Sequence, residues 1–125
     1  MAAISIAYQD AGLKPHRANF VELYVTGTVV GDSIEANAAG AMLSEGCQGR
    51  ELVIRSVRSN VGHSEMGAYM ISLIKVVMML NRKQILPNGK FKKHWCKIEF
   101  SKYNLRVARA VEPMSPQNPR RQSSL

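Results

Sequence analysis

Two short polar segments, each after an apolar run, hold the residues best suited to chemistry. The first runs from Thr26 to Gly31, and the second runs from Arg58 to an imidazole at His63. Glycine between a strand and a helix N-terminus offers free N–H groups and a positive dipole end, so the first segment could hold a phosphate. It lacks the lysine of a P-loop, and a tight strand-to-helix turn is the alternative.

Titratable side chains near these segments allow two interpretations. A neutral His63 could act as a general base or as an oxyanion donor, or it could be a helix-capping or core histidine. Asp32 and Glu65 stand where helices are expected to start, and the helix dipole alone would favour carboxylates there. Lys75 lies within an apolar run, so it must reach a buried carboxylate or extend to an edge.

Metal and nucleic-acid binding are not predicted. The two cysteines, Cys47 and Cys96, form no C-x-x-C pair and are expected to be inert thiols, and three scattered histidines make no zinc site. The basic stretch from Lys90 to Lys97 contains Phe91 and Trp95 but no recognised nucleic-acid motif. A solvated face, or a docking patch for an acidic partner, is the favoured interpretation.

Composition bounds the class of protein. The 125 residues carry a net charge of +8 and are 46% hydrophobic, which is typical of one soluble globular domain. Two cysteines favour a reducing compartment. No signal-peptide pattern is present, and the apolar run from Met66 to Leu80 is too short to cross a bilayer. We therefore expect a cytoplasmic protein without a membrane partner.

The pattern of apolar residues predicts the elements that must position these side chains. Helices are expected at 2–11, from Asp32 onward and at about 63–81, and strands at 20–25, 52–57 and 105–111, with a disordered tail at 113–125. The second helix should begin with a capping box formed by Asp32 and Glu35, and it should pack through Ile34, Ala38, Ala41 and Met42.

The order of these elements indicates an α/β fold with right-handed crossovers. The helix expected at 63–81 is apolar on nearly every side, and such a helix must be covered all round. A chain of this length can hardly cover it alone, so the sequence predicts a partner surface.

The two polar segments, taken in order, resemble a known family. Residues 21–36, VELYVTGTVVGDSIEA, resemble the V-E-x-H-G-T-G-T-x-x-G-D-P-I-E-A signature of polyketide ketosynthases, and 56–63, SVRSNVGH, resemble their S-V-K-S-N-x-G-H. Further similar stretches lie at 73–77, 84–88, 97–100 and 104–107. The similarity runs from about Ile4 to Val107, and it is closest to the fungal iterative type.

This resemblance implies the C-terminal half of a thiolase-like fold, with a domain at 1–112 and the nucleophilic cysteine in the other half. Tyr24 stands where the family has its first active-site histidine, Val25 where it has glycine, and Arg58 where it has lysine. The second active-site histidine is kept as His63. Thr26 and Thr28 match threonines that contact the pantetheine arm.

Decarboxylative condensation needs a thiolate and two imidazoles, so we do not expect this chain to be a condensing enzyme. A phenol titrates near ~10 and cannot replace a base near neutrality. The expected activity is instead a cyclase that lactonises a polyketide to an α-pyrone, using positioning and proton transfer. His63 would be the base, oriented by Asp32 or Glu65. Tyr24 and Arg58 would donate hydrogen bonds, and Thr26, Thr28 and Asn60 would bind substrate.

No cofactor is expected beyond a substrate linked to phosphopantetheine. The partner would be a polyketide thioester or free acid, and a polyketide synthase or an acidic carrier protein. The rival hypothesis is a non-catalytic pseudo-ketosynthase that docks to such a partner, or a decayed fragment that still folds. Because the parent fold has two similar halves, two copies could rebuild it as a homodimer.

Overall fold

The computed structural model describes residues 2–45, 49–62, 67–89 and 97–114. Their elements follow one another along the chain as α1 (Ala2–Asp10), a 3-10 turn η1 (Pro15–Arg17), β1 (Phe20–Glu22), α2 (Val29–Leu43), β2 (Leu52–Arg55), α3 (Arg58–Val61), α4 (Ala68–Arg82), β3 (Gln84–Ile85), β4 (Leu105–Val107) and β5 (Glu112–Pro113).

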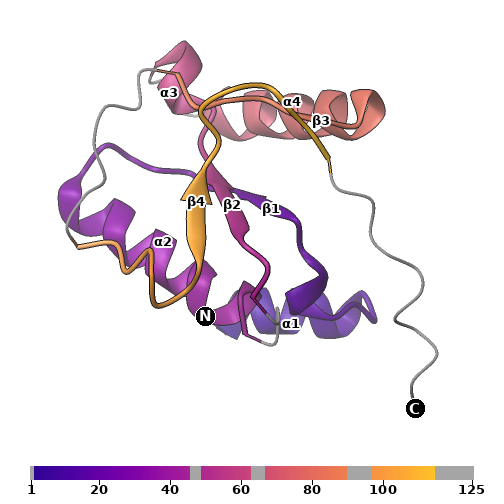
Figure 1. The fold of residues 1–125 in the computed structure, drawn as a ribbon, viewed down its shortest axis with the longest axis vertical. Coiled ribbons are helices and arrows are strands. Elements are labelled where there is room, and N and C mark those ends of the chain that lie inside the picture. Colours follow the sequence, from indigo (N-terminus) through magenta and orange to yellow (C-terminus); the bar gives the residue numbers. More distant parts are fainter. Residues whose placement is uncertain (1, 46–48, 63–66, 90–96, 115–125) are drawn as a thin grey trace.

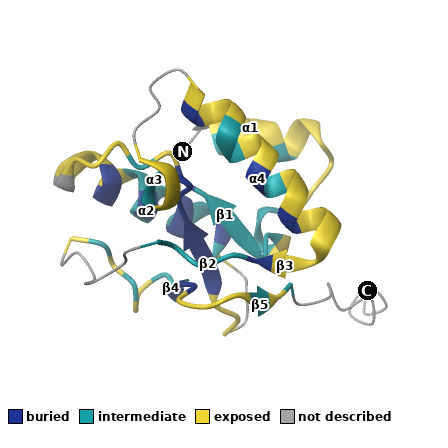
Figure 2. Ribbon diagram, turned by 90° about the horizontal axis from the view of Figure 1, so that it is seen from above, coloured by how far each residue is buried: buried dark blue, intermediate teal, exposed yellow. Residues whose placement is uncertain are grey.

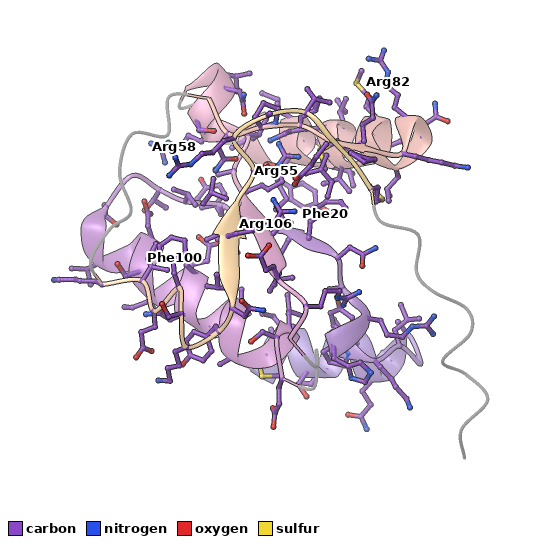
Figure 3. The ribbon with its side chains drawn as sticks, viewed as in Figure 1. Phe20, Arg55, Arg58, Arg82, Phe100 and Arg106 are labelled. Atoms are coloured by element: carbon purple, nitrogen blue, oxygen red, sulfur yellow. The ribbon has the colours of Figure 1, made fainter. Side chains whose placement is uncertain are left out.

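The main sheet has three parallel strands in the order β1-β2-β4 (Figure 1). Phe20 lies opposite Val53, and Leu52 lies opposite Leu105. A separate antiparallel pair joins β3 to β5. Arg106 of β4 connects the two, because its guanidinium lies 2.8 Å from Glu112 Oε1 and 2.9 Å from Glu51 Oε2 (Figure 3). The predicted α/β class is confirmed.

Alternation along the strands divides the core into two faces. One face joins the sheet to α1 and α2 through a cluster of buried residues: Leu23, Ala36, Ala39, Leu43, Leu52, Ile54, Leu105 and Val107. Ile4 and Tyr8 of α1 pack against this cluster, as the sequence predicts for that helix. The other face carries Val53 with Ile85 and Ala108, and it turns toward α4.

The packing stripe of α2 differs from the prediction. Its buried residues are Asp32, Ser33, Ala36, Ala39, Gly40 and Leu43, whereas Ile34 is 65% exposed. The expected stripe of Ile34, Ala38, Ala41 and Met42 was therefore wrong for Ile34, and the other three are only half-buried. Gly40 lies on the buried face of α2 because Tyr103 packs directly on it and leaves no room for a side chain.

Replacing Gly40 with alanine should therefore destabilise the fold. A Cβ at Gly40 would lie 2.8 Å from Cβ and Cγ of Tyr103, so the new methyl displaces the ring. Overpacking of this kind costs about 1–3 kcal/mol of unfolding free energy, measured by urea denaturation. In a Tyr103→Ala background the same change should be neutral or favourable, because alanine is the better helix former. A cost that persists there would show that the ring is not its cause.

Other boundaries also differ from the sequence prediction. β1 and β2 end at Glu22 and Arg55, earlier than expected, and the expected loop at 58–63 contains the short helix α3. The last strand, expected at 105–111, is shorter: β4 ends at Val107, and the next strand, β5, begins only at Glu112. The disordered tail expected at 113–125 was wrong for its first two residues, since Pro113 belongs to β5 and Met114 N–H donates to Lys83 O at 2.8 Å. Residues 115–125 lie outside the described part.

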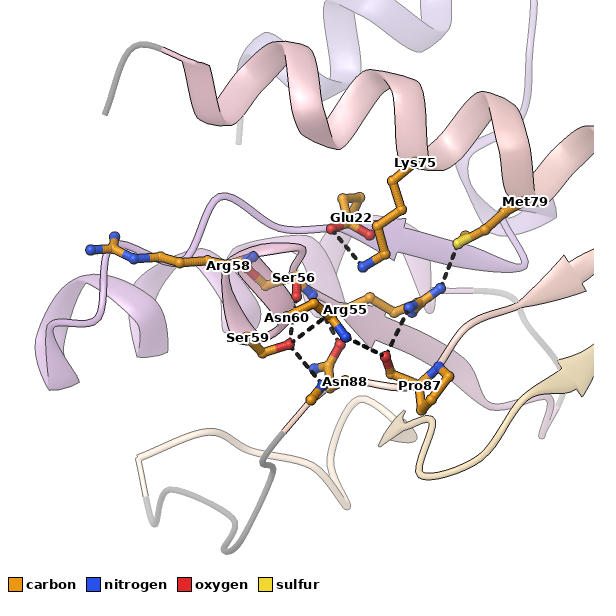
Figure 4. A network of polar contacts seen from close by, with 11 residues as sticks. Glu22, Arg55, Ser56, Arg58, Ser59, Asn60, Lys75, Met79, Pro87 and Asn88 are labelled. Carbon is orange, nitrogen blue, oxygen red and sulfur yellow. Dashed lines mark hydrogen bonds and ion pairs between the residues drawn. The ribbon is translucent and has the colours of Figure 1, made fainter. Parts of the chain in front are cut away.

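Helix α4 is attached to the sheet by polar side chains (Figure 4). Lys75 Nζ lies 3.2 Å from Glu22 Oε1, and the two side chains are 9% and 6% exposed. Lys75 thus reaches a buried carboxylate, one of its two predicted outcomes. Beside this pair, the fully buried Arg55 donates to Met79 Sδ at 2.6 Å. Burial lowers the pKa of Lys75, and the neighbouring charge of Arg55 lowers it further, against the attraction of Glu22.

Glu22 therefore pairs with the buried Lys75 and also attracts the buried Arg55, on which Glu112 acts as well. Removing the carboxylate and removing one cation should then have unequal costs. Glu22→Gln leaves Lys75 and Arg55 without that anion and should cost about 3–5 kcal/mol of stability at neutral pH. Lys75→Met leaves Glu22 to balance Arg55 and should cost clearly less. Adding Lys75→Met to Glu22→Gln should recover stability in thermal denaturation. Equal costs for the two single variants would contradict this charge balance.

Candidate functional site

The turn after β1 is fixed by a carboxylate from α2. Glu35 accepts hydrogen bonds from the backbone N–H of Tyr24 at 2.7 Å and of Val25 at 2.9 Å. Arg58 Nη1 donates to Val25 O at 3.1 Å from the start of α3 (Figure 3). Val25 itself has a φ of 46°, a left-handed conformation that β-branched residues avoid. These three charge-assisted bonds hold the strained turn in place.

Glycine at this position should therefore be tolerated unusually well. Val25 and Val21 are both half-buried against the same cluster, but only Val25 has a positive φ. Each valine-to-glycine change loses packing, whereas Val25→Gly also releases about 1–2 kcal/mol of backbone strain. Urea denaturation should show Val25→Gly to be at least ~1 kcal/mol less costly than Val21→Gly. Equal losses would mean that the turn stores no strain.

The threonine-bearing loop continues from this turn into α2. The hydroxyls of Thr26 and Thr28 lie 3.1 Å apart, and Asp32 Oδ1 accepts from Gly27 N–H at 3.1 Å and from Thr26 Oγ at 3.4 Å. Gly31 makes room for both threonines, since a Cβ there would lie 2.6 Å from Thr28 Oγ. The loop thus exposes two hydroxyls, and the hydrogen bonds to Asp32 fix its backbone.

Asp32 is 3% exposed, and its Oδ2 has no hydrogen-bond partner among the described residues. The sequence assigned Asp32 and Glu35 to a capping box, which is wrong. The helix begins at Val29, with Thr28 as its N-cap residue, and both carboxylates reach back to the preceding loop. The expected role of Asp32 in orienting His63 stays a prediction, because His63 lies outside the described residues.

A second polar cluster fixes the segment after β3 against α3. Gly89 N–H donates to Ser59 Oγ at 3.1 Å, and Ser56 N–H donates to Asn88 Oδ1 at 3.2 Å. Asn60 Nδ2 lies 3.4 Å from Pro87 O (Figure 4). Asn60 therefore contacts this segment, and among the described residues no hydrogen bond joins it to Thr26 or Thr28. Its expected contact with substrate remains a prediction.

The structure thus joins part of the predicted set. Thr26, Thr28, Asp32 and Arg58 are linked around one loop at the carboxyl ends of β1 and β2, the edge where parallel sheets bind ligands. Tyr24 is the first residue of this loop and is 46% exposed. His63 and Glu65 lie outside the described residues, as do Cys47, Cys96 and the basic stretch at 90–96.

Sequence reasoning missed Glu35 as a residue of the site. Its carboxylate follows Asp32 by three positions, and that spacing is what led to the capping-box interpretation. The described residues contain no group of three or more histidine, cysteine or carboxylate side chains able to hold a metal. Nor does any helix in the described ranges have the length and apolarity to cross a membrane.

Comparison with known proteins identifies the family. The model of the beta-ketoacyl synthase C-terminal domain matches residues 1–92. A highly reducing polyketide synthase of Strobilurus tenacellus is 37% identical over 94% of this chain, and the squalestatin hexaketide synthase clz14 of Cochliobolus lunatus is 42% identical over 90%. This chain spans 4% of the length of either relative.

Solved ketosynthase structures share the fold. The oxazolomycin ketosynthase domain OzmH KS7 of Streptomyces albus superposes with a TM-score of 0.81 at 28% identity, covering 90% of this chain and 20% of that one. The ketosynthase from module 6 of the bacillaene synthase of Bacillus subtilis gives 0.78 at 30% identity, covering 87% and 20%. The chain belongs to the polyketide ketosynthase family, as a C-terminal segment of the thiolase-like fold, and the predicted resemblance is confirmed.

Proposed function

We propose that this chain is an accessory protein of polyketide biosynthesis that closes a linear polyketide into a lactone, and that it does not extend carbon chains. The observation that carries the proposal is the rigid loop at 24–28. This loop carries the exposed Tyr24, where the family has an imidazole, and the paired hydroxyls of Thr26 and Thr28, and Arg58 donates to its Val25 carbonyl. These are hydrogen-bond donors, suited to supporting a carbonyl oxyanion.

The proposed reaction needs one base and oxyanion support. His63 takes the proton from the 5-hydroxyl, or from the enol of a 3,5-dioxo substrate, and that oxygen attacks the C1 thioester carbonyl. The C–O bond forms, the C–S bond breaks, and the thiolate leaves and takes up the proton. Tyr24 and Arg58 donate to the C1 oxygen, while Thr26 and Thr28 hold the pantetheine arm. Asp32, Glu65 and Asn60 complete the proposed set, in a cytoplasmic protein.

Positioning supplies most of the rate in this mechanism, because the reaction is intramolecular and its product ring has six members. Holding the chain in the cyclising conformer is worth on the order of several kcal/mol of activation free energy. A turn that three charge-assisted hydrogen bonds immobilise is suited to that task. No cofactor takes part beyond the phosphopantetheine that can carry the substrate.

The test is lactone formation from a synthetic 5-hydroxy-3-oxo thioester and its 3,5-dioxo relative, followed by chromatography and thiol release. The purified chain should accelerate release over buffer, with saturation in substrate. Tyr24→Phe and His63→Ala should each lower kcat about 10–1,000-fold with the fold retained. The control variant Lys102→Ala, which removes an exposed ion pair with Glu99, should leave kcat unchanged. Thiol release equal to that in buffer would remove the proposal.

A second candidate function is docking without catalysis. The observation that favours it is the net charge of +8, which suits an acidic carrier protein. A pseudo-ketosynthase of this kind would bind a synthase or carrier protein, and His63→Ala would leave that binding intact. Under either function we expect two copies of the chain to associate.

A further inference from the structure

Helix α4 has its polar and apolar sides reversed relative to an ordinary surface helix. The buried residues of α4 are Ala68, Lys75 and Met79, and Lys75 forms an ion pair with Glu22 of the sheet. Seven of its large apolar residues are instead exposed, and Figure 2 colours much of α4 as exposed: Tyr69, Met70, Leu73, Ile74, Val77, Met78 and Leu80. At 3.6 residues per turn these seven occupy one half of the helix circumference.

These seven residues form the α4 face, which is large enough for a protein–protein interface. Each residue is between 44% and 68% exposed, so several hundred Å² of apolar side chain meet water. A patch of that extent marks an interaction site in soluble proteins. It approaches the ~800 Å² per partner of a standard protein–protein interface.

The charge distribution of α4 argues against an acidic carrier protein as the partner that binds this face. The one charged residue between Tyr69 and Leu80 is Lys75, and it is turned inward to Glu22. A surface that recognises an acidic partner needs exposed cations, whereas this one offers only apolar groups. The α4 face of a second copy is a suitable partner, because two apolar faces can pack together without burying an unpaired charge.

We propose that the α4 face binds the same face of a second copy of this chain, with the two α4 helices antiparallel about a two-fold axis at Ile74. Arg82 and Lys83 end the helix, and Arg82 points away from the strands (Figure 3). A parallel pair would bring these cations together and align the two helix dipoles. The antiparallel pair separates them by the length of the helix. This inference extends the expected association and does not depend on the proposed lactone-forming activity.

Oligomeric state is the first test. Analytical ultracentrifugation of the full chain should show a dimer, and Ile74→Glu should raise its dissociation constant about tenfold or more. The matched control is Ile34→Glu, an equally apolar and exposed isoleucine on α2, which should leave the dimer intact. Circular dichroism verifies that each variant is folded. A wild-type monomer, or a dimer that Ile74→Glu leaves unchanged, would overturn the proposal.

Disulfide cross-linking is the second test, and it also covers the case in which Ile74→Glu does not fold. With Cys47 and Cys96 replaced by serine, a mixture of Met70→Cys and Met78→Cys chains should form the mixed dimer on mild oxidation. Met70→Cys alone should cross-link poorly, because in the antiparallel pair residue 70 lies opposite residue 78. Efficient Met70–Met70 linkage would indicate a parallel pair, and no linkage in any combination would indicate another surface; both contradict the proposal.

Discussion

The candidate site depends on one side chain, the carboxylate of Glu35. It accepts two adjacent backbone N–H groups, from Tyr24 and Val25, and so turns the chain sharply as it leaves β1. Hydrogen bonds to a charged group contribute about 1.5–3 kcal/mol each, enough to offset the left-handed conformation of a valine. Arg58 secures the turn from the other side. Everything proposed for Tyr24, Thr26 and Thr28 follows from that fixed backbone.

A different constraint governs the opposite face of the sheet. The buried side of α4 carries Lys75, which pairs with Glu22, beside Ala68 and Met79, and the larger apolar residues of α4 are left exposed. Breaking a buried ion pair is costly even though forming one gains little. The ionic contact therefore fixes which side of α4 faces the sheet, and with it the surface available to a partner.

Sequence reasoning predicted the fold class, the order of the three longest helices and the three sheet strands, and the family, because apolar periodicity and two motif-bearing loops are local signals. It did not predict α3, β3 or β5. Of the two outcomes it allowed for Lys75, the structure shows the buried carboxylate. It missed the inner face of α2, because Gly40 packs through the approach of Tyr103, about 60 residues along the chain, which no local pattern reveals. It misread Glu35 because a carboxylate three positions after Asp32 is equally typical of a capping box.

The most direct test of the account is the saturation kinetics of lactone formation by Glu35→Gln beside the wild-type chain. Glutamine keeps the size of the side chain but can accept the two N–H groups only through one uncharged oxygen. The account predicts that the wild-type protein forms lactone faster than buffer and that the variant, still folded, has a lower kcat. A wild-type rate equal to that in buffer, or a variant as fast as the wild type, would contradict it.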